Sequence, residues 1–440
     1  MKEDYKPRVV TILQLGLPMI VAMLSQSLIN LVDAALVGPL GEEALAAVGA
    51  GSNATLVAMA LIAGVSSGVQ AQVARRVGKG LISQCAVPVN HGILIAFCFA
   101  LPLSVALVIA APFILKLYSP DLDTAVLYFR IRVMTLTAAV MNISFRGYWN
   151  GTSKPRGFLK ILLISHVFNA LTSYILIYGK LGLPAMGVAG AALGTFLSMY
   201  LCALLNIKSL RHKARQHGLF TRWRGRSSFI RLVTLALPDS IQQFFFCMGI
   251  MVLYIIISML GTSEMAIAHV LINISLFLIL PGVGLGIAAT TLVSKSLGKK
   301  DLEDAWRWGR DVLMVAVVIL MALGIPFIFF PGFFLSWFLH DPKLLAMAKF
   351  PLQLVCIGII VDAGALVLPQ ALLGAGANRT VLCIRFFFQW LVLLPLCWLV
   401  GPTMGLGLSA IWAIQGVQRL LSSLTFIWFW DKRKWSVINI

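Results

Sequence analysis

Charged residues, and acidic ones above all, are scarce in this sequence. Only 12% of its 440 residues are charged, and 16 Asp and Glu stand against 35 Lys and Arg. Soluble domains carry about 25% charged residues. With 60% hydrophobic residues, the chain has too little polar surface to cover a water-soluble globule. The composition therefore excludes an ordinary soluble domain and indicates a membrane protein.

Cysteine pairs and nucleotide-binding motifs are also missing. The seven Cys stand apart in apolar stretches without a C-x-x-C pair, so we expect buried free thiols, no disulfide framework and no metal site. The sequence contains no P-loop and no H-E-x-x-H motif. We therefore expect no enzyme and no cofactor, and any work that needs energy would draw on an ion gradient or on another domain.

Long apolar runs fill most of the chain. A helix needs about 20 residues to cross a bilayer. The runs lie at 12–38, 45–72, 88–115, 124–147, 158–179, 186–207, 230–260, 265–293, 311–338, 346–373, 380–400 and 405–430. They predict about twelve transmembrane helices, with both chain ends on one side.

Basic residues gather in alternate loops, and the longest basic segment is 208–230. The net charge of +19 therefore reports topology through the positive-inside rule and does not indicate a nucleic-acid partner. We expect both termini and this segment in the cytoplasm, with the chain in the cell membrane. In a Gram-negative source that would be the inner membrane.

The two halves of the chain are repeats. The matched pairs, at an offset of 220, are Leu17-Pro18 with Leu237-Pro238, Leu40-Gly41 with Leu260-Gly261, and Gly78-Lys79 with Gly298-Lys299. Fixed spacing through two helices and their loops indicates duplication, and an even number of helices per half gives both repeats the same orientation.

The predicted fold is an all-α integral membrane protein with two parallel six-helix repeats around a central cavity. The N-terminal lobe covers 1–207, a basic cytoplasmic linker covers 208–230, and the C-terminal lobe covers 231–440. We expect a monomer in the lipid bilayer.

Acidic residues inside apolar runs are the candidates for chemistry. An ionised Asp at the bilayer centre costs about 2.5–3.5 kcal/mol, so such residues usually serve ion or proton movement. Asp33 shares one helix face with Gln26 and Asn30, at i, i+4 and i+7. We interpret Asp33 as a cation-coupling residue with Gln26 and Asn30 in its shell. A structural hydrogen bond between helices is the alternative.

A second candidate carboxylate, Asp362, lies seven residues before Pro369, which predicts a kink nearby. Asp239 follows Pro238 directly, and we interpret it as a helix-start residue at the cytoplasmic face. Three further polar residues are candidates for the cation or substrate shell: Asn169, Ser173 and Gln242.

Across nearly its whole length the chain resembles the multidrug and toxic compound extrusion (MATE) family. The motifs that carry the resemblance are LGLP at 15–18, VDAALVG at 32–38, LAAVG at 45–49, RGYWNG at 146–151 and GVAGAA at 187–192. By position, the resemblance implies that Asp33, Gln26 and Asn169 form the polar cluster of the N-terminal lobe.

The same resemblance implies a sodium-linked acid at Asp362, twelve residues before Gly374. The seventh-helix acid of that branch falls near Phe246, and the family's fifth-helix acid falls at Ser173. The Phe side chain offers no oxygen to Na⁺, so we favour H⁺ as the coupling ion, with Na⁺ as the alternative.

The function that the family implies is export of drugs or cations by rocker-type alternating access, with Na⁺ or H⁺ moving inward. We expect bulky organic cations as substrates, because a carboxylate and aromatic rings can hold a cation. Two other functions stay open: a flippase of a lipid-linked saccharide or peptidoglycan precursor, and a membrane channel or scaffold.

Overall fold

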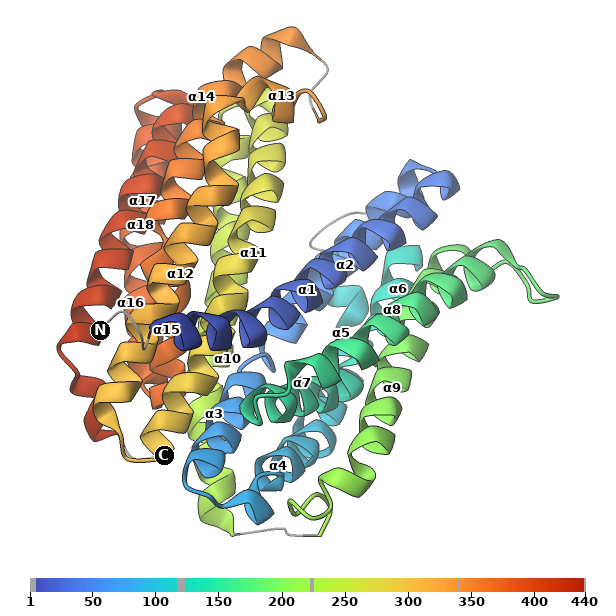
Figure 1. Ribbon diagram of the computed structural model, residues 1–440. Helices are drawn as coiled ribbons and strands as arrows, with labels where there is room; N and C mark the ends of the chain where they lie inside the picture. Colours follow the sequence, from blue (N-terminus) through green and yellow to red (C-terminus); the bar gives the residue numbers. More distant parts are fainter. Residues whose placement is uncertain (1–4, 117–122, 222–224, 339–340, 439–440) are drawn as a thin grey trace. The chain divides into compact units, whose positions relative to one another are not determined.

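The computed structural model describes residues 5–116, 123–221, 225–338 and 341–438. The described chain is helical, with short 3₁₀ and π segments and no strand (Figure 1). The first half contains α1 (Tyr5–Val37), α2 (Glu42–Ala60), α3 (Val65–Gly78), α4 (Val87–Ile95), α5 (Leu101–Leu115), α6 (Asp123–Val133), α7 (Leu136–Gly151), α8 (Pro155–Tyr178) and α9 (Gly187–Lys213). The second half contains α10 (Arg226–Ser258), α11 (Thr262–Gly298), α12 (Leu302–Phe329), α13 (Pro331–Leu335), α14 (Pro342–Val361), α15 (Ala363–Ala375), α16 (Asn378–Phe386), α17 (Leu394–Trp398) and α18 (Gly407–Asp431). Residues 222–224 of the predicted linker lie outside the described residues.

Ten of the described helical segments are long and apolar enough to cross a membrane. α6 and α7, bent by 41° at a short break, make an eleventh if they form one span. α18 has 25 residues, but Gln415, Gln418 and Arg419 at its centre lower its hydropathy. With α18, these segments correspond to the twelve predicted runs.

The duplication is visible in the helix bounds. α1 and α10 each have 33 residues and enclose Pro18 and Pro238, respectively. The segments Glu42–Gly78 and Thr262–Gly298 each have 37 residues. The glycines that precede these segments, Gly41 and Gly261, have φ angles of 107° and 148°, a backbone region that only glycine adopts without strain. The predicted pair of repeats is confirmed.

By packing, the chain forms two units: an N-terminal unit, Val21–Gln243, and a C-terminal unit, Met1–Ile20 with Phe244–Ile440. These units differ from the predicted lobes because the first part of α1 packs in the C-terminal unit and the first part of α10 in the N-terminal unit. The predicted lobe boundaries describe the duplication, whereas the units describe the packing.

Two equivalent close contacts explain why the first helices pack this way. In the N-terminal unit, a Cβ added to Gly64 would stand 2.7 Å from the backbone nitrogen of Ser240. In the C-terminal unit, a Cβ added to Gly284 would stand 3.1 Å from the backbone nitrogen of Ile20. The offset of 220 relates both members of these pairs (284 − 64 and 240 − 20). In each repeat, the absence of a side chain at the glycine therefore lets the first helix of the other repeat pack closely against it.

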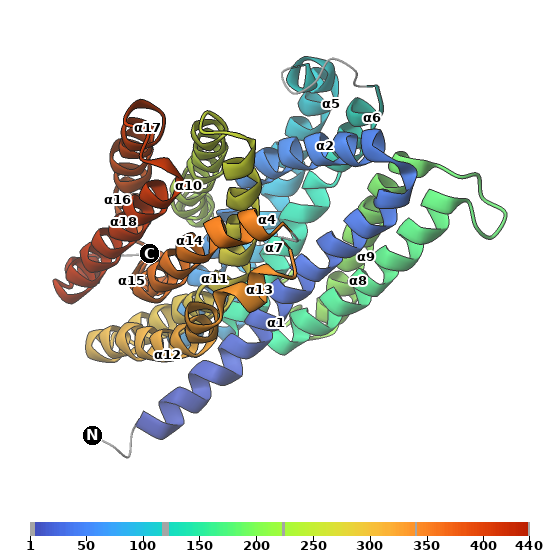
Figure 2. The same cartoon turned by 90° about the horizontal axis from the view of Figure 1, so that it is seen from above.

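Small residues also bring the helices together within the N-terminal unit. α8 and α9 run side by side (Figure 2). On α7, Gly147 and Gly151 are one turn apart and face Val69 and Val73 of α3, with Cβ positions 3.0 and 2.8 Å from the valine side chains. Such glycines let helix backbones approach closely in membrane proteins.

In the C-terminal unit α11 packs along α15. Thr290 donates through Oγ1 to the Gln370 carbonyl at 2.7 Å, and Ser294 donates through Oγ to the Gly374 carbonyl at 2.6 Å. These hydroxyls satisfy polar groups between two apolar helices, so the contact fixes the register of α15, the helix that follows Asp362.

Candidate ion-coupling sites

Asp33 lies in the last turns of α1, four residues before its end at Val37. Its Oδ1 atom is buried and has no hydrogen-bond partner among the described residues. Asn169 of α8 is a hydrogen-bonding neighbour of the carboxyl group, and Arg132 of α6 acts on it through its charge. The structure therefore brings Asp33 together with residues of two other helices.

Asn169 is held in place by the rest of α8. The Ser173 hydroxyl donates to Asn169 Oδ1 at 3.1 Å, and the two residues are 0% and 4% exposed, Ser173 being the fully buried one. Because the Asn169 oxygen accepts from Ser173, the Asn169 NH₂ group is the part of the amide that can donate to the Asp33 carboxyl group. The predicted shell residues Asn169 and Ser173 thus lie together beside Asp33.

The register of α8 against α1 is set near the end of both helices. The Tyr178 hydroxyl donates to the Leu36 carbonyl at 2.8 Å. On the other side of α8, a Cβ on Gly194 of α9 would stand 2.2 Å from Ser173 Oγ. Tyr178 and Gly194 therefore keep Ser173 and Asn169 at the level of Asp33.

Gln26 and Asn30, the amides predicted to complete the shell, lie on the same face of α1. Both are exposed, and Gln26 Nε2 donates to Asn30 Oδ1 at 3.4 Å. Their role beside Asp33 stays a prediction. Gln242, another shell candidate, is 5% exposed, and its Nε2 donates to Gln243 Oε1 at 3.5 Å.

Arg132 is a neighbour of Asp33 that the sequence interpretation missed. It lies in the last turn of α6, and its Nε is buried without a hydrogen-bond partner among the described residues. From the sequence, Arg132 reads as a basic residue that complements a helix end. Only the packing of α6 in the N-terminal unit brings its charge to the carboxylate.

The interpretation of Asp239 as a helix-start residue is wrong. α10 begins at Arg226, so Pro238 and Asp239 lie inside the helix. The Ser67 hydroxyl donates to Asp239 Oδ2 at 2.5 Å, and the backbone N–H of Gly64 donates to Ser240 Oγ at 3.1 Å. Asp239 is therefore a polar contact between α10 and the start of α3.

The residues at the start of α3 also match the G-x-S-x-G pattern of hydrolases, as Gly64-Val65-Ser66-Ser67-Gly68. That pattern carries chemistry only where a strand turns sharply into a helix. In the described chain no strand precedes this helix, and Ser66 Oγ accepts from Arg146 Nη2 at 3.0 Å. The small residues of this pattern therefore serve helix packing, and the pattern does not indicate a hydrolase.

Asp362 lies at a break in the C-terminal unit, between α14 and α15. Its Oδ2 atom is 3.1 Å from Arg419 Nη1 of α18, and the two side chains are only 13% and 17% exposed. Arg385 of α16 adds a second positive charge that acts on the same carboxylate. The sequence interpretation placed Asp362 in its run and missed both arginines as partners.

The position of the seventh-helix acid, Phe246, lies in an aromatic region. Gln389 Nε2 donates to the Phe246 carbonyl at 3.2 Å, and Trp390 Nε1 donates to the Phe245 carbonyl at 3.2 Å. The ring centroids of Phe245 and Phe386 are 4.9 Å apart. Aromatic packing and side-chain donors to backbone carbonyls therefore hold this part of the unit together.

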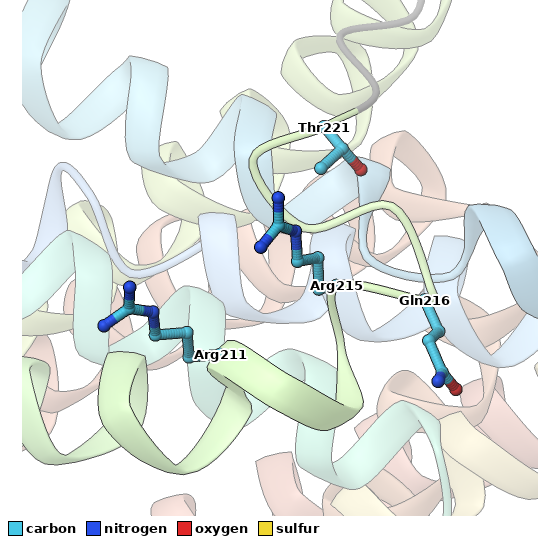
Figure 3. Close-up of a pocket in the computed structure, with 4 residues that line it drawn as sticks. All are labelled: Arg211, Arg215, Gln216 and Thr221. Carbon is cyan, nitrogen blue, oxygen red and sulfur yellow. The ribbon is translucent and has the colours of Figure 1, made fainter.

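A pocket of about 670 Å³ lies at the end of α9, lined by Arg211, Arg215, Gln216 and Thr221 (Figure 3). Its residues belong to the basic segment predicted as a cytoplasmic linker, away in sequence from the carboxylates above. Among the described residues, no group of three or more His, Cys, Asp or Glu side chains could hold a metal ion. The seven cysteines are free thiols, and all are buried except Cys98 and Cys383.

A duplicated bundle of membrane-spanning helices with polar residues buried between them is the architecture of a secondary transporter. The family model described as MatE matches residues 18–175 and 238–399, which is more than half of the chain. The chain belongs to the MATE family of multi-pass membrane transporters, as its motifs predicted.

Relatives in this family carry names of drug resistance. The chain is 25% identical over 406 residues to the probable multidrug resistance protein NorM of Pasteurella multocida (strain Pm70), with 91% of this chain and 88% of that protein covered. It is 28% identical over 416 residues to the probable NorM of Agrobacterium fabrum (strain C58 / ATCC 33970), with the same coverage of 91% and 88%.

The fold matches a solved structure described as an outward-facing conformation of a multidrug resistance MATE family transporter of the MOP superfamily. The TM-score is 0.90 at 20% sequence identity, and the match covers 98% of this chain and 96% of that one. At this identity the likeness concerns the fold.

Proposed function

We propose that this chain is an antiporter that exports small organic compounds, bulky cations above all, in exchange for protons. The family and the names of its relatives support efflux of small molecules. Asp33 supports the choice of proton: it is a carboxyl group in a membrane helix whose Oδ1 is buried without a hydrogen-bond partner in the described chain. The transported proton would occupy this carboxyl group.

Na⁺ is a poorer fit at Asp33 than H⁺ is. A hard cation requires several oxygen ligands, but the Asn169 oxygen already accepts from Ser173. Arg132 also places a positive charge near the carboxylate, which repels a second cation. A proton requires only one carboxyl oxygen and no further ligands.

The transport cycle follows from the change of charge at Asp33. Protonation from outside neutralises the carboxylate and leaves Arg132 without its counter-charge, so the packing of α1 against α6 and α8 changes. Release of the proton to the cytoplasm restores a negative charge that attracts a cationic substrate. The protein acts by alternating between these two states.

The proton gradient supplies enough free energy for export. One proton that moves inward across 100 mV releases about 2.3 kcal/mol. Because about 1.4 kcal/mol corresponds to a tenfold ratio, this sustains roughly a fifty-fold substrate gradient per proton before any pH gradient is added. We place both termini and the basic segment around 208–230 in the cytoplasm, so that protons enter from the opposite side.

The test is efflux of a fluorescent organic cation from proteoliposomes with separately imposed H⁺ and Na⁺ gradients. We expect wild type to respond to H⁺ and Asp33→Asn to lose at least 90% of gradient-driven transport, because it keeps the shape of the side chain but cannot titrate. Glu43→Gln, which neutralises an exposed acid at the start of α2, is the matched control and should keep wild-type transport.

Four results would contradict the proposal. Normal H⁺-driven efflux by Asp33→Asn would remove Asp33 from the mechanism. A response to Na⁺ alone would replace the coupling ion. Flux that only dissipates a substrate gradient would indicate a channel, and activity confined to lipid-linked saccharides would indicate a flippase.

A further inference from the structure

The C-terminal unit contains a buried ion pair at Asp362, the acid for which the family resemblance implied a sodium link. The structure assigns to Arg419 the role of a permanent counter-ion of Asp362. Its positively charged side chain occupies the place at the carboxylate where a transported cation would otherwise bind. Arg419 therefore determines ion specificity, because it removes the sodium site from this unit and leaves coupling to the N-terminal unit. The inference rests on the proposed antiport only for its transport readout.

The pair is built from two helices that pack side by side. Arg419 Nη1 lies 3.1 Å from Asp362 Oδ2, with both side chains mostly buried. Asp362 is held at the break in its span: its N–H donates to the Gly358 carbonyl, and its carbonyl accepts from the Leu366 N–H, each at 2.9 Å. The aliphatic stem of Arg419 passes Gly358, with Cδ 3.5 Å from where a Cβ would stand. The contact between α14 and α18 therefore aims the guanidinium at the carboxylate.

A second arginine is fixed beside the pair by a proline. Pro369 has no N–H, so the Ala365 carbonyl loses its helical hydrogen bond. Arg385 Nη2 donates to that carbonyl at 3.2 Å, and the Arg385 charge acts on Asp362. Two arginines and one aspartate give this cluster a net charge of +1, which repels a metal cation.

A second position that the resemblance links to sodium has no carboxylate in this chain. Phe246 stands at the position of the seventh-helix acid, and its carbonyl accepts from Gln389 Nε2 at 3.2 Å. Gln389 is packed tightly, because a Cβ on Gly249 would stand 2.0 Å from its Nε2. A sodium ion would have to displace Arg419 from Asp362 and leave a buried guanidinium without its partner, which is strongly unfavourable.

A double-mutant cycle on Asp362→Asn and Arg419→Gln separates a counter-ion from a coupling residue. Removing one partner of a buried pair leaves an uncompensated charge, whereas neutralising both is often tolerated. We expect each single variant to lose at least tenfold in H⁺-driven transport and several degrees in melting temperature. The double variant should regain transport to within about threefold of wild type and most of the melting temperature. Arg419→Lys, which keeps the charge, is the control and should fall between wild type and Arg419→Gln.

Sodium itself is the second probe. We expect the melting temperature of wild type to be the same in sodium chloride and in choline chloride at equal ionic strength. If the double variant is as inactive as Asp362→Asn, or if Na⁺ stabilises wild type through Asp362, the inference is overturned. These stability readouts do not depend on transport, so they decide the role of Arg419 even if wild type shows no H⁺-driven efflux and the proposed function fails.

Discussion

A single methyl group at Gly64 tests the packing between α3 and α10. In Gly64→Ala the new Cβ would stand 2.1 Å from the Ala236 carbonyl oxygen, 2.7 Å from the Ser240 backbone nitrogen and 2.9 Å from Ser240 Oγ. Two of these atoms belong to the helix backbone and cannot move without moving α10. Overpacking of this kind costs about 1–3 kcal/mol. Loss of the Gly64 N–H bond to Ser240 Oγ, 3.1 Å long, adds about 0.5–1.5 kcal/mol.

We therefore expect Gly64→Ala to lower the free energy of unfolding by about 2–4 kcal/mol. The measurement is denaturant unfolding of the purified protein in mixed micelles. Two matched substitutions provide stability losses with which that of Gly64→Ala can be compared. Gly284→Ala, the equivalent in the other repeat, meets a side-chain atom of Ile20 first, at 2.6 Å, and should lose less because a side chain can shift. Gly49→Ala, with no atom within 4 Å, should lose nothing.

Equal stability of Gly64→Ala and Gly49→Ala would refute the close approach of α3 to α10. A larger loss in Gly284→Ala than in Gly64→Ala would refute the distinction between backbone and side-chain contacts. Either result would also remove the physical reason for the exchange of first helices between the packing units.

Two further predictions concern the proposed topology and the response to pH. In a cysteine-free background, a Cys at Gln216 should resist an impermeant thiol reagent applied outside intact cells, whereas a Cys at Lys180 should react; the reverse pattern would invert the proposed orientation. Burial, and then the charge of Lys154, lower the pKa of His217 below its ordinary value of 6.5. The folded state therefore binds this proton more weakly than the unfolded chain does. The stability that His217 contributes is complete above about pH 6.5 and is lost as the pH falls through the lowered pKa. We expect the melting temperature to drop more between about pH 7.5 and 5.5 in wild type than in His217→Gln, which also changes the hydrogen bond between His217 Nδ1 and the Tyr148 hydroxyl, 2.7 Å long. Equal drops would contradict this account.

The polar stripes predicted which residues share one face of a helix, but not all of their partners. Asn169 and Ser173 are one turn apart, and the structure joins them by a hydrogen bond of 3.1 Å. Gln26 and Asn30 share a face in the same way, yet Asp33 receives its neighbours from α6 and α8. Helical periodicity gives the direction of a side chain relative to its own helix, and it contains no information about which other helix that direction meets.

The two arginines of the C-terminal unit illustrate the same limit. Arg419 follows Gln418 within an otherwise apolar run, which could have marked α18 as a helix with a buried charge. Pro369 predicted a disturbed helix. The disturbance is that the Ala365 carbonyl has no helical N–H donor, and it accepts a hydrogen bond from Arg385 instead. The proline could be read from the sequence, but the donor that compensates for it could not.

Composition and spacing alone determined that this protein is a helical membrane protein made of two repeats. Those properties depend on local quantities: the length of apolar runs, the loss of solvation of charges, and the backbone freedom of glycines such as Gly41 and Gly261. Only the tertiary structure decided that the first parts of α1 and α10 pack in the unit of the other repeat, that Asp239 bonds Ser67, and that Arg419 neutralises Asp362. Each of these contacts joins residues more than fifty positions apart in the chain, and only the close packing of helices through small residues brings such residues within reach of one another.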